Sequence, residues 1–148
     1  MTTTGSTGNP QFRYQSGLGR ADAYVVSGRP FARGGMDSSA TIVRVTFPAV
    51  TRWVRIINNG LAASGDLKCA FSENGLPSKG GDNYFTLQDR SSGGDRTGHN
   101  VAMFELKLTE MWFEGSNNFD VIAGLTNINV NQINTGGIIN WSGSAGVG

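Results

Sequence analysis

The side chains able to do acid–base or nucleophilic chemistry are few in this chain of 148 residues, which holds one histidine and one cysteine. His99 lies in a polar stretch beside Asp95, Arg96 and Asn100. A histidine base needs a nucleophile and a group that orients it, and this stretch offers no strand to position them. Cys69 occupies an inward position of an alternating run, where we expect a small buried side chain, and a single cysteine excludes an intrachain disulfide. We therefore expect no enzymatic activity and no catalytic residue.

Acidic residues in glycine-rich loops are candidate calcium ligands. Asp82, Asp89 and Asp95 lack the spacing of the helix–loop–helix calcium site, which needs alternating acids and a glutamate at its twelfth position. The stretch Gly17–Gly19 lacks the third glycine of a dinucleotide-binding loop, and no glycine-rich stretch is followed by GK[ST]. The pattern predicts no metal and no cofactor, although it leaves calcium binding by a single loop open.

Two tryptophans, Trp53 and Trp112, fall out of phase with some of the core residues of their predicted strands. Aromatic rings on the face of a sandwich can stack on pyranose rings, as they do in sandwich lectins. Aromatic residues in strands more often belong to a core or an interface. Trp53 and Trp112 are therefore the candidate residues of an alternative function, glycan binding.

Arginine is concentrated in the first part of the chain. Residues 1–55 contain seven arginines and two aspartates, a net charge of +5, whereas the rest contains five basic and nine acidic residues, a net charge of −4. Arginine forms bidentate pairs with carboxylates, so the arginine-rich part suits either the acidic part of another subunit or neighbouring strands of its own. The overall charge of +1 is too small for nonspecific nucleic-acid binding.

Polar segments lie on both sides of the strands that must position these residues. Residues 1–19 are predicted to form an extended N-terminal arm, residues 20–130 a β-sandwich domain, and residues 131–148 a Gly/Asn-rich C-terminal tail. Aromatic, arginine and large apolar side chains in such surroundings are typical of interfaces. The candidate partner-binding residues are Phe12, Arg13, Tyr14, Arg20, Arg29, Arg33, Ile138, Ile139 and Trp141.

Short β-branched and aromatic runs separated by Gly, Asn, Pro and Ser predict about seven strands. We expect strands at Ala23–Ser27, Thr41–Phe47, Thr51–Ile57, Leu67–Ser72, Tyr84–Gln88, Val101–Phe113 and Phe119–Thr126. Gly28 and Pro30 are expected to close the first strand, Asp89–Asn100 to form a solvated loop, and Gly115–Asn118 to join the last two strands as a hairpin.

Alternation assigns one face of each strand to the core. The inward residues are predicted to be Val43, Val45, Phe47, Leu67, Cys69, Phe71, Phe85, Leu87, Phe104, Leu106, Leu108, Val121, Ala123 and Leu125. About seven strands without a helix longer than a turn bury such faces in a sandwich or a barrel. We predict an all-β fold, a single antiparallel β-sandwich that is jelly-roll-like.

Part of this sequence resembles a known class of proteins. The segment VRVTFPAVTRWVRIINNG from Val43, DLKCAFSENGL after it, and FELKLTEMWFEGSNNFDVIAGLTNI from Phe104 resemble small β-sandwich structural proteins of tailed bacteriophages, especially capsid decoration or cement proteins and other minor virion components. The similarity spans residues 41–127 and is one of general pattern. It implies a non-enzymatic protein that binds the outside of a capsid at trimeric or pseudo-trimeric points and clamps neighbouring major capsid subunits.

The expected function is therefore that of a virion structural protein. Its expected partners are the major capsid protein or other virion subunits and further copies of the chain, with a trimer as the assumed oligomer. We expect no nucleic-acid partner and no membrane partner, and a location on the capsid surface after synthesis in the host cytoplasm, without a secretion signal. The alternative is a receptor- or glycan-binding sandwich of a phage tail, fibre or vertex.

Overall fold

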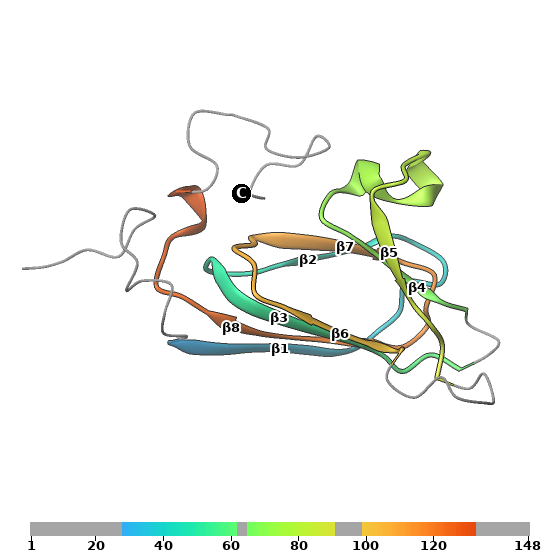
Figure 1. Ribbon diagram of the computed structural model, residues 1–148, viewed down its shortest axis with the longest axis horizontal. Helices are drawn as coiled ribbons and strands as arrows, with labels where there is room; N and C mark the ends of the chain where they lie inside the picture. The colour runs from blue at the N-terminus through green and yellow to red at the C-terminus, as the bar shows by residue number, and fades with distance from the viewer. Residues whose placement is uncertain (1–27, 62–64, 91–98, 133–148) are drawn as a thin grey trace, which may run out of the picture.

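The chain forms two four-stranded antiparallel β-sheets packed as a sandwich, in a computed structural model that describes residues 28–61, 65–90 and 99–132 (Figure 1). Sheet 1 has the strand order β1-β8-β3-β6, and sheet 2 has the order β2-β7-β4-β5. The strands are β1 (Arg29–Met36), β2 (Val43–Thr46), β3 (Thr51–Asn58), β4 (Leu67–Ala70), β5 (Tyr84–Leu87), β6 (Val101–Phe104), β7 (Glu110–Glu114) and β8 (Phe119–Leu125). The 3-10 turns are η3 (Glu73–Gly75), η4 (Pro77–Lys79) and η5 (Val130–Gln132). The predicted all-β sandwich is confirmed.

Alternating side chains explain why these segments form strands. In β2, Val45 is buried while Arg44 and Thr46 are exposed, and in β8 Val121 and Ala123 are buried. The predicted inward positions confirmed as buried are Val45, Phe47, Leu67, Cys69, Leu87, Leu108, Val121, Ala123 and Leu125. Val43, Phe71, Phe85 and Phe104 are partly buried and pack against this core.

Aromatic pairs among the described residues join the two sheets at three places. The Phe31 ring of β1 meets Phe47, which follows β2, edge-on at a centroid distance of 5.0 Å. Phe85 of β5 meets Phe104 of β6 at 5.9 Å, and Phe113 of β7 meets Phe119 of β8 at 4.9 Å. Such pairs stabilise a core beyond their buried area, so each sheet fixes the position of the other along its length.

Pro30, expected with Gly28 to close the strand Ala23–Ser27, lies instead within a strand. Pro30 lies inside β1, which pairs with β8 alone at the edge of sheet 1. An edge strand tolerates proline because one side of its backbone needs no hydrogen-bond donor. The register of β1 shifts between Arg33 and Met36, where Gly35 adopts a φ of 65°. Turn-forming residues therefore mark an edge and a bulge in this strand.

The prediction of one long strand from Val101 to Phe113 is also wrong. β6 belongs to sheet 1 and β7 to sheet 2, so the chain crosses between the sheets after Phe104. The Thr51 hydroxyl fixes this crossing, since it donates to Leu106 O at 2.7 Å and accepts from Leu108 N at 2.9 Å. Leu106, predicted to point inward, is 42% exposed, whereas Leu108 is buried as expected.

The predicted hairpin between the last two strands does not form. β7 and β8 lie in different sheets, and the chain between them crosses the sandwich. Gly115 begins the crossing with a φ of 104°, and a Cβ there would lie 2.5 Å from Asp66 O. Buried Ser116 then donates from Oγ to Asn58 Oδ1 at 2.7 Å. A positive φ and a buried hydroxyl thus direct the chain into the other sheet, and not into a β-turn.

Several predicted features lie outside the described residues. These are the arm of residues 1–19, the strand Ala23–Ser27, the central part of the Asp89–Asn100 loop and nearly all of the 131–148 tail. The candidate partner-binding residues among them are Phe12, Arg13, Tyr14, Arg20, Ile138, Ile139 and Trp141.

Candidate functional site

The two described members of the candidate partner interface are Arg29 and Arg33, and both lie exposed on β1. Opposite them in the register of β8 are Leu125 and Val121, both core residues, so the two arginines share one phase of the strand. Only β8 pairs with β1 in the described part of the chain. Among the described strands β1 is thus an edge strand that carries arginine side chains, an arrangement that can accept a strand or carboxylates from a partner.

The two candidate glycan-binding tryptophans do not come together. Trp53 is on β3 of sheet 1 and Trp112 is on β7 of sheet 2. Each is out of phase with buried neighbours, Val54 in β3 and Phe113 in β7, so each points away from the core. The tryptophans therefore lie on opposite outer faces of the sandwich and cannot share one sugar-binding site.

Trp112 has its own polar surroundings on the outer face of sheet 2. The Arg44 guanidinium lies over its ring at 5.2 Å from the centroid. Arg44 also forms an ion pair with Glu110 and donates from Nε to Glu110 Oε2 at 2.6 Å. The Glu110 side chain is only 10% exposed, so this pair is shielded on one side. In the register, Arg44 lies beside Trp112, followed by Ala70 and Tyr84 across the sheet.

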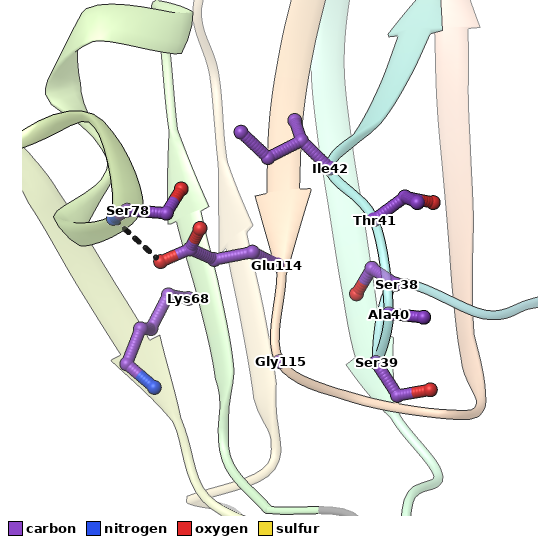
Figure 2. A pocket seen from close by; sticks show the side chains of 9 residues that line it. All are labelled: Ser38, Ser39, Ala40, Thr41, Ile42, Lys68, Ser78, Glu114 and Gly115. Carbon is purple, nitrogen blue, oxygen red and sulfur yellow. Dashed lines mark hydrogen bonds between the residues drawn. The ribbon is translucent and has the colours of Figure 1, made fainter.

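A hollow of about 260 Å³, open to solvent, lies beside the crossing between β7 and β8 (Figure 2). Its walls carry hydroxyls from several segments, an ammonium group from Lys68 and a carboxylate from Glu114. Glu114 points toward η4, where its Oε1 accepts from Ser78 N at 3.3 Å, and Lys68 points away from it. The lining residues are Ser38, Ser39, Ala40, Thr41, Ile42, Lys68, Ser78, Glu114 and Gly115.

The candidate catalytic residues, Cys69 and His99, and the candidate calcium ligands, Asp82 and Asp89, each have different surroundings. Cys69 is buried in the core, and burial raises the pKa of its thiol well above the ordinary value. His99 is exposed in a turn, where its backbone carbonyl accepts from Gln88 N at 3.2 Å. Asp82 is exposed, and Asp89 donates from its backbone to Asp66 Oδ1 at 3.0 Å. Within residues 28–61, 65–90 and 99–132, no three His, Cys, Asp or Glu side chains gather as metal ligands.

Sequence reasoning missed a set of apolar residues on the outer face of sheet 1. Ile57, Met103 and Ile122 alternate with core residues on β3, β6 and β8 and therefore point outward. The available signal was the presence of apolar residues on both faces of β3, since Trp53 and Ile57 are out of phase with Val54 and Ile56. A strand with one solvated face would place polar residues at every second position, as β3 does only at Arg55.

Comparison of the chain with protein-family models, with curated proteins and with solved structures gives no match. Among the described residues, no helix has the length and hydrophobicity needed to cross a membrane.

Proposed function

We propose that this protein is a virion structural protein, a capsid decoration or cement protein built on a jelly roll. The observation that carries the proposal is the strand pairing: β1 pairs with β8, β2 with β7, β3 with β6 and β4 with β5. This nested pairing is what a long two-stranded ribbon gives when it is folded over into two sheets. Jelly rolls of this kind serve as viral capsid and lectin domains, and the fold supports a binding role by analogy.

The proposed partner is the major capsid protein or another virion subunit. Arg29 and Arg33 on the open edge of β1 are suited to carboxylates and backbone groups of such a partner. The aromatic and arginine residues of the N-terminal arm and the Ile138-Ile139 and Trp141 positions of the tail would add further contacts. Several modest contacts made at once raise the effective concentration of each and slow dissociation by orders of magnitude. Clamping of neighbouring capsid subunits follows from this multivalency.

Binding to capsid shells tests the proposal directly. The full chain is mixed with shells assembled from a major capsid protein encoded in the same genome, and the bound fraction is measured by co-sedimentation. We expect saturable binding at a fixed ratio, weakened at least tenfold by Arg29→Ala together with Arg33→Ala. Arg90→Ala, an exposed arginine away from β1, is the matched control. A chain that never sediments with the shells refutes the proposal.

Glycan binding is the second candidate, and the row of Arg44, Trp112, Ala70 and Tyr84 favours it over a site at Trp53. A small number of placed polar groups beside aromatic side chains fixes the orientation of a bound ligand. Arg44 already covers one face of the Trp112 ring, so a sugar must use the other face or displace the guanidinium. Glycan-array binding that is lost in Trp112→Ala and retained in Trp53→Ala would favour this function over shell binding.

A further inference from the structure

The outer face of sheet 1 is largely apolar, and no described strand or 3-10 turn lies over it (Figure 1). Val54, Ile56 and Val121 of this sheet belong to the core, so the residues that alternate with them point outward. Met103 on the edge strand β6 is 61% exposed. An outer face that is apolar apart from Arg55 and Asp120 is typical of an interaction surface. We call it the sheet 1 face; its residues are Pro30, Ala32, Trp53, Arg55, Ile57, Val101, Met103, Asp120, Ile122 and Gly124.

The sheet 1 face is stepped along the boundary between β8 and β3. Read from β1 toward β6, its rows are Pro30–Gly124–Trp53, then Ala32–Ile122–Arg55–Met103, then Asp120–Ile57–Val101. In the first row Pro30 and Gly124 are small beside Trp53, and in the middle row Ala32 of β1 is small whereas Met103 of β6 is large. Ile122 of β8 is the large residue in the otherwise low half. One half of the face is therefore low and the other half is raised.

We propose that the sheet 1 face joins two copies of this chain around a two-fold axis that runs parallel to the strands, along the boundary between β8 and β3. This rotation places β3 of one copy over β8 of the other, and β6 over β1. Trp53 then lies over Gly124 of the second copy, and Met103 lies over Ala32. In these two places a large side chain of one copy meets a small one of the other, and symmetry supplies each match twice.

The positions of the charged residues on the sheet 1 face are also compatible with this two-fold axis. Arg55 is exposed in the middle row, and the rotation brings it over Ile122 of the second copy, one row from Asp120. The Asp120 carboxylate is held in place, since Oδ1 accepts from Gly35 N and Oδ2 from Asn59 Nδ2, both at 2.8 Å. Each copy thus offers one cation and one fixed anion in positions that the two-fold rotation brings near each other.

The size of the face sets the strength of the contact. Four strands about 4.8 Å apart and three rows about 6.6 Å apart outline roughly 400 Å². A standard interface buries about 800 Å² on each partner. We therefore expect a dimer that forms reversibly with concentration, so that single substitutions shift the equilibrium measurably.

The test is sedimentation equilibrium of the purified full chain with two charge substitutions at exposed positions, Met103→Lys and Ala32→Glu. The wild-type chain is expected to approach twice its mass of 15.7 kDa as concentration rises. Each variant alone is expected to raise the dissociation constant at least tenfold. An equimolar mixture of the two is expected to regain dimer, because the introduced charges then face each other. Thr86→Glu, exposed on β5 of sheet 2, is the matched control and should dimerise like wild type.

Thermal melting of each variant checks that it folds, and both sites are exposed, so the melting temperature should stay near that of the wild type. The proposal is overturned by a wild-type chain that stays monomeric, by a trimer, by a dimer that neither variant weakens, or by a mixture that regains nothing. The measurement uses no capsid shells. Its failure therefore leaves shell binding untouched, and failure of shell binding leaves the dimer untouched.

Discussion

The Asn58 side chain holds together the end of the sandwich near the β7–β8 crossing. It is fully buried at the end of β3. Its Nδ2 donates to Leu87 O at 3.0 Å and to Gln88 O at 3.1 Å. Its Oδ1 accepts from Gly60 N at 3.0 Å and from Ser116 Oγ at 2.7 Å. One amide therefore ties β3 of sheet 1 to the end of β5 in sheet 2 and to the crossing segment.

Asn58→Ala removes all four bonds and leaves their partners buried. Each such bond contributes about 1 kcal/mol net, and more when a buried group is left unpaired, so we expect a loss of about 4 kcal/mol. For a domain of this size 1 kcal/mol corresponds to roughly 3–4 °C, which gives a fall in melting temperature of roughly 12–16 °C. Asn58→Asp keeps both acceptor functions and loses the two donors. We expect it to recover partly at acidic pH, where a protonated carboxyl can donate again.

Urea unfolding and calorimetry of the full chain measure this loss, with Asn59→Ala as the neighbouring control. Asn59 is half-buried, and its side chain donates one bond, to Asp120 Oδ2 at 2.8 Å. We expect the control to lose about 1 kcal/mol. If Asn58→Ala and Asn59→Ala destabilise the protein equally, the buried amide does not hold this end of the sandwich and the reasoning is wrong.

Three further predictions concern single positions. Gly115→Ala should destabilise the protein by about 2 kcal/mol more than Gly80→Ala in urea unfolding, because both glycines have a positive φ but only a Cβ at Gly115 meets backbone; equal losses would contradict this. Thr51→Val should lose about 2 kcal/mol, since the hydroxyl bonds on both sides of the β6–β7 crossing disappear, and a change in urea midpoint no larger than that of the exposed Thr46→Val would contradict it. Burial raises the pKa of the Cys69 thiol in the folded state above its value in the unfolded state, which is about 8.5. The contribution of this difference to the free energy of unfolding is therefore complete below about pH 8.5 and falls as the pH rises from there toward the folded-state pKa. Melting temperatures between about pH 7 and 9.5 should show this decline in wild type and a weaker one in Cys69→Ala.

Alternation predicted the strands that bury one face and keep the other in solvent. The runs around Val45, Cys69 and Val121 name their inward residues correctly, because a period of two is set by the strand itself. The same rule failed across Val101–Phe113, where Leu106 continues the alternating pattern into a segment that leaves the sheet. The signal for the crossing is the hydroxyl of Thr51, 55 positions away, and no local pattern carries it.

The surroundings of the candidate interface residues are harder to predict than the core for a related reason. The chemistry of Arg29 and Arg33 makes them candidate interface residues, but Pro30 and the glycines of the bulge conceal the strand that presents them. Alternation places Ile122 and Ile57 on the outer face of their strands, but only the sheet order shows that they lie on the same face of one sheet. Sequence gives the type of a side chain, whereas its exposure depends on which strands become neighbours.

The two outer faces of the sandwich differ, and the difference connects the two proposals. Sheet 2 carries the polar outer face, with the Arg44–Glu110 ion pair and η4 hydrogen-bonded to Glu114. Sheet 1 carries the apolar one, bordered by the open edge of β1. In the two-fold dimer proposed above, β1 of each copy lies over β6 of the other, so the two arginine-bearing edges point in opposite directions. If the chain binds capsid subunits as proposed, such a dimer would engage two of them at once, and self-association would add to the gain in effective concentration.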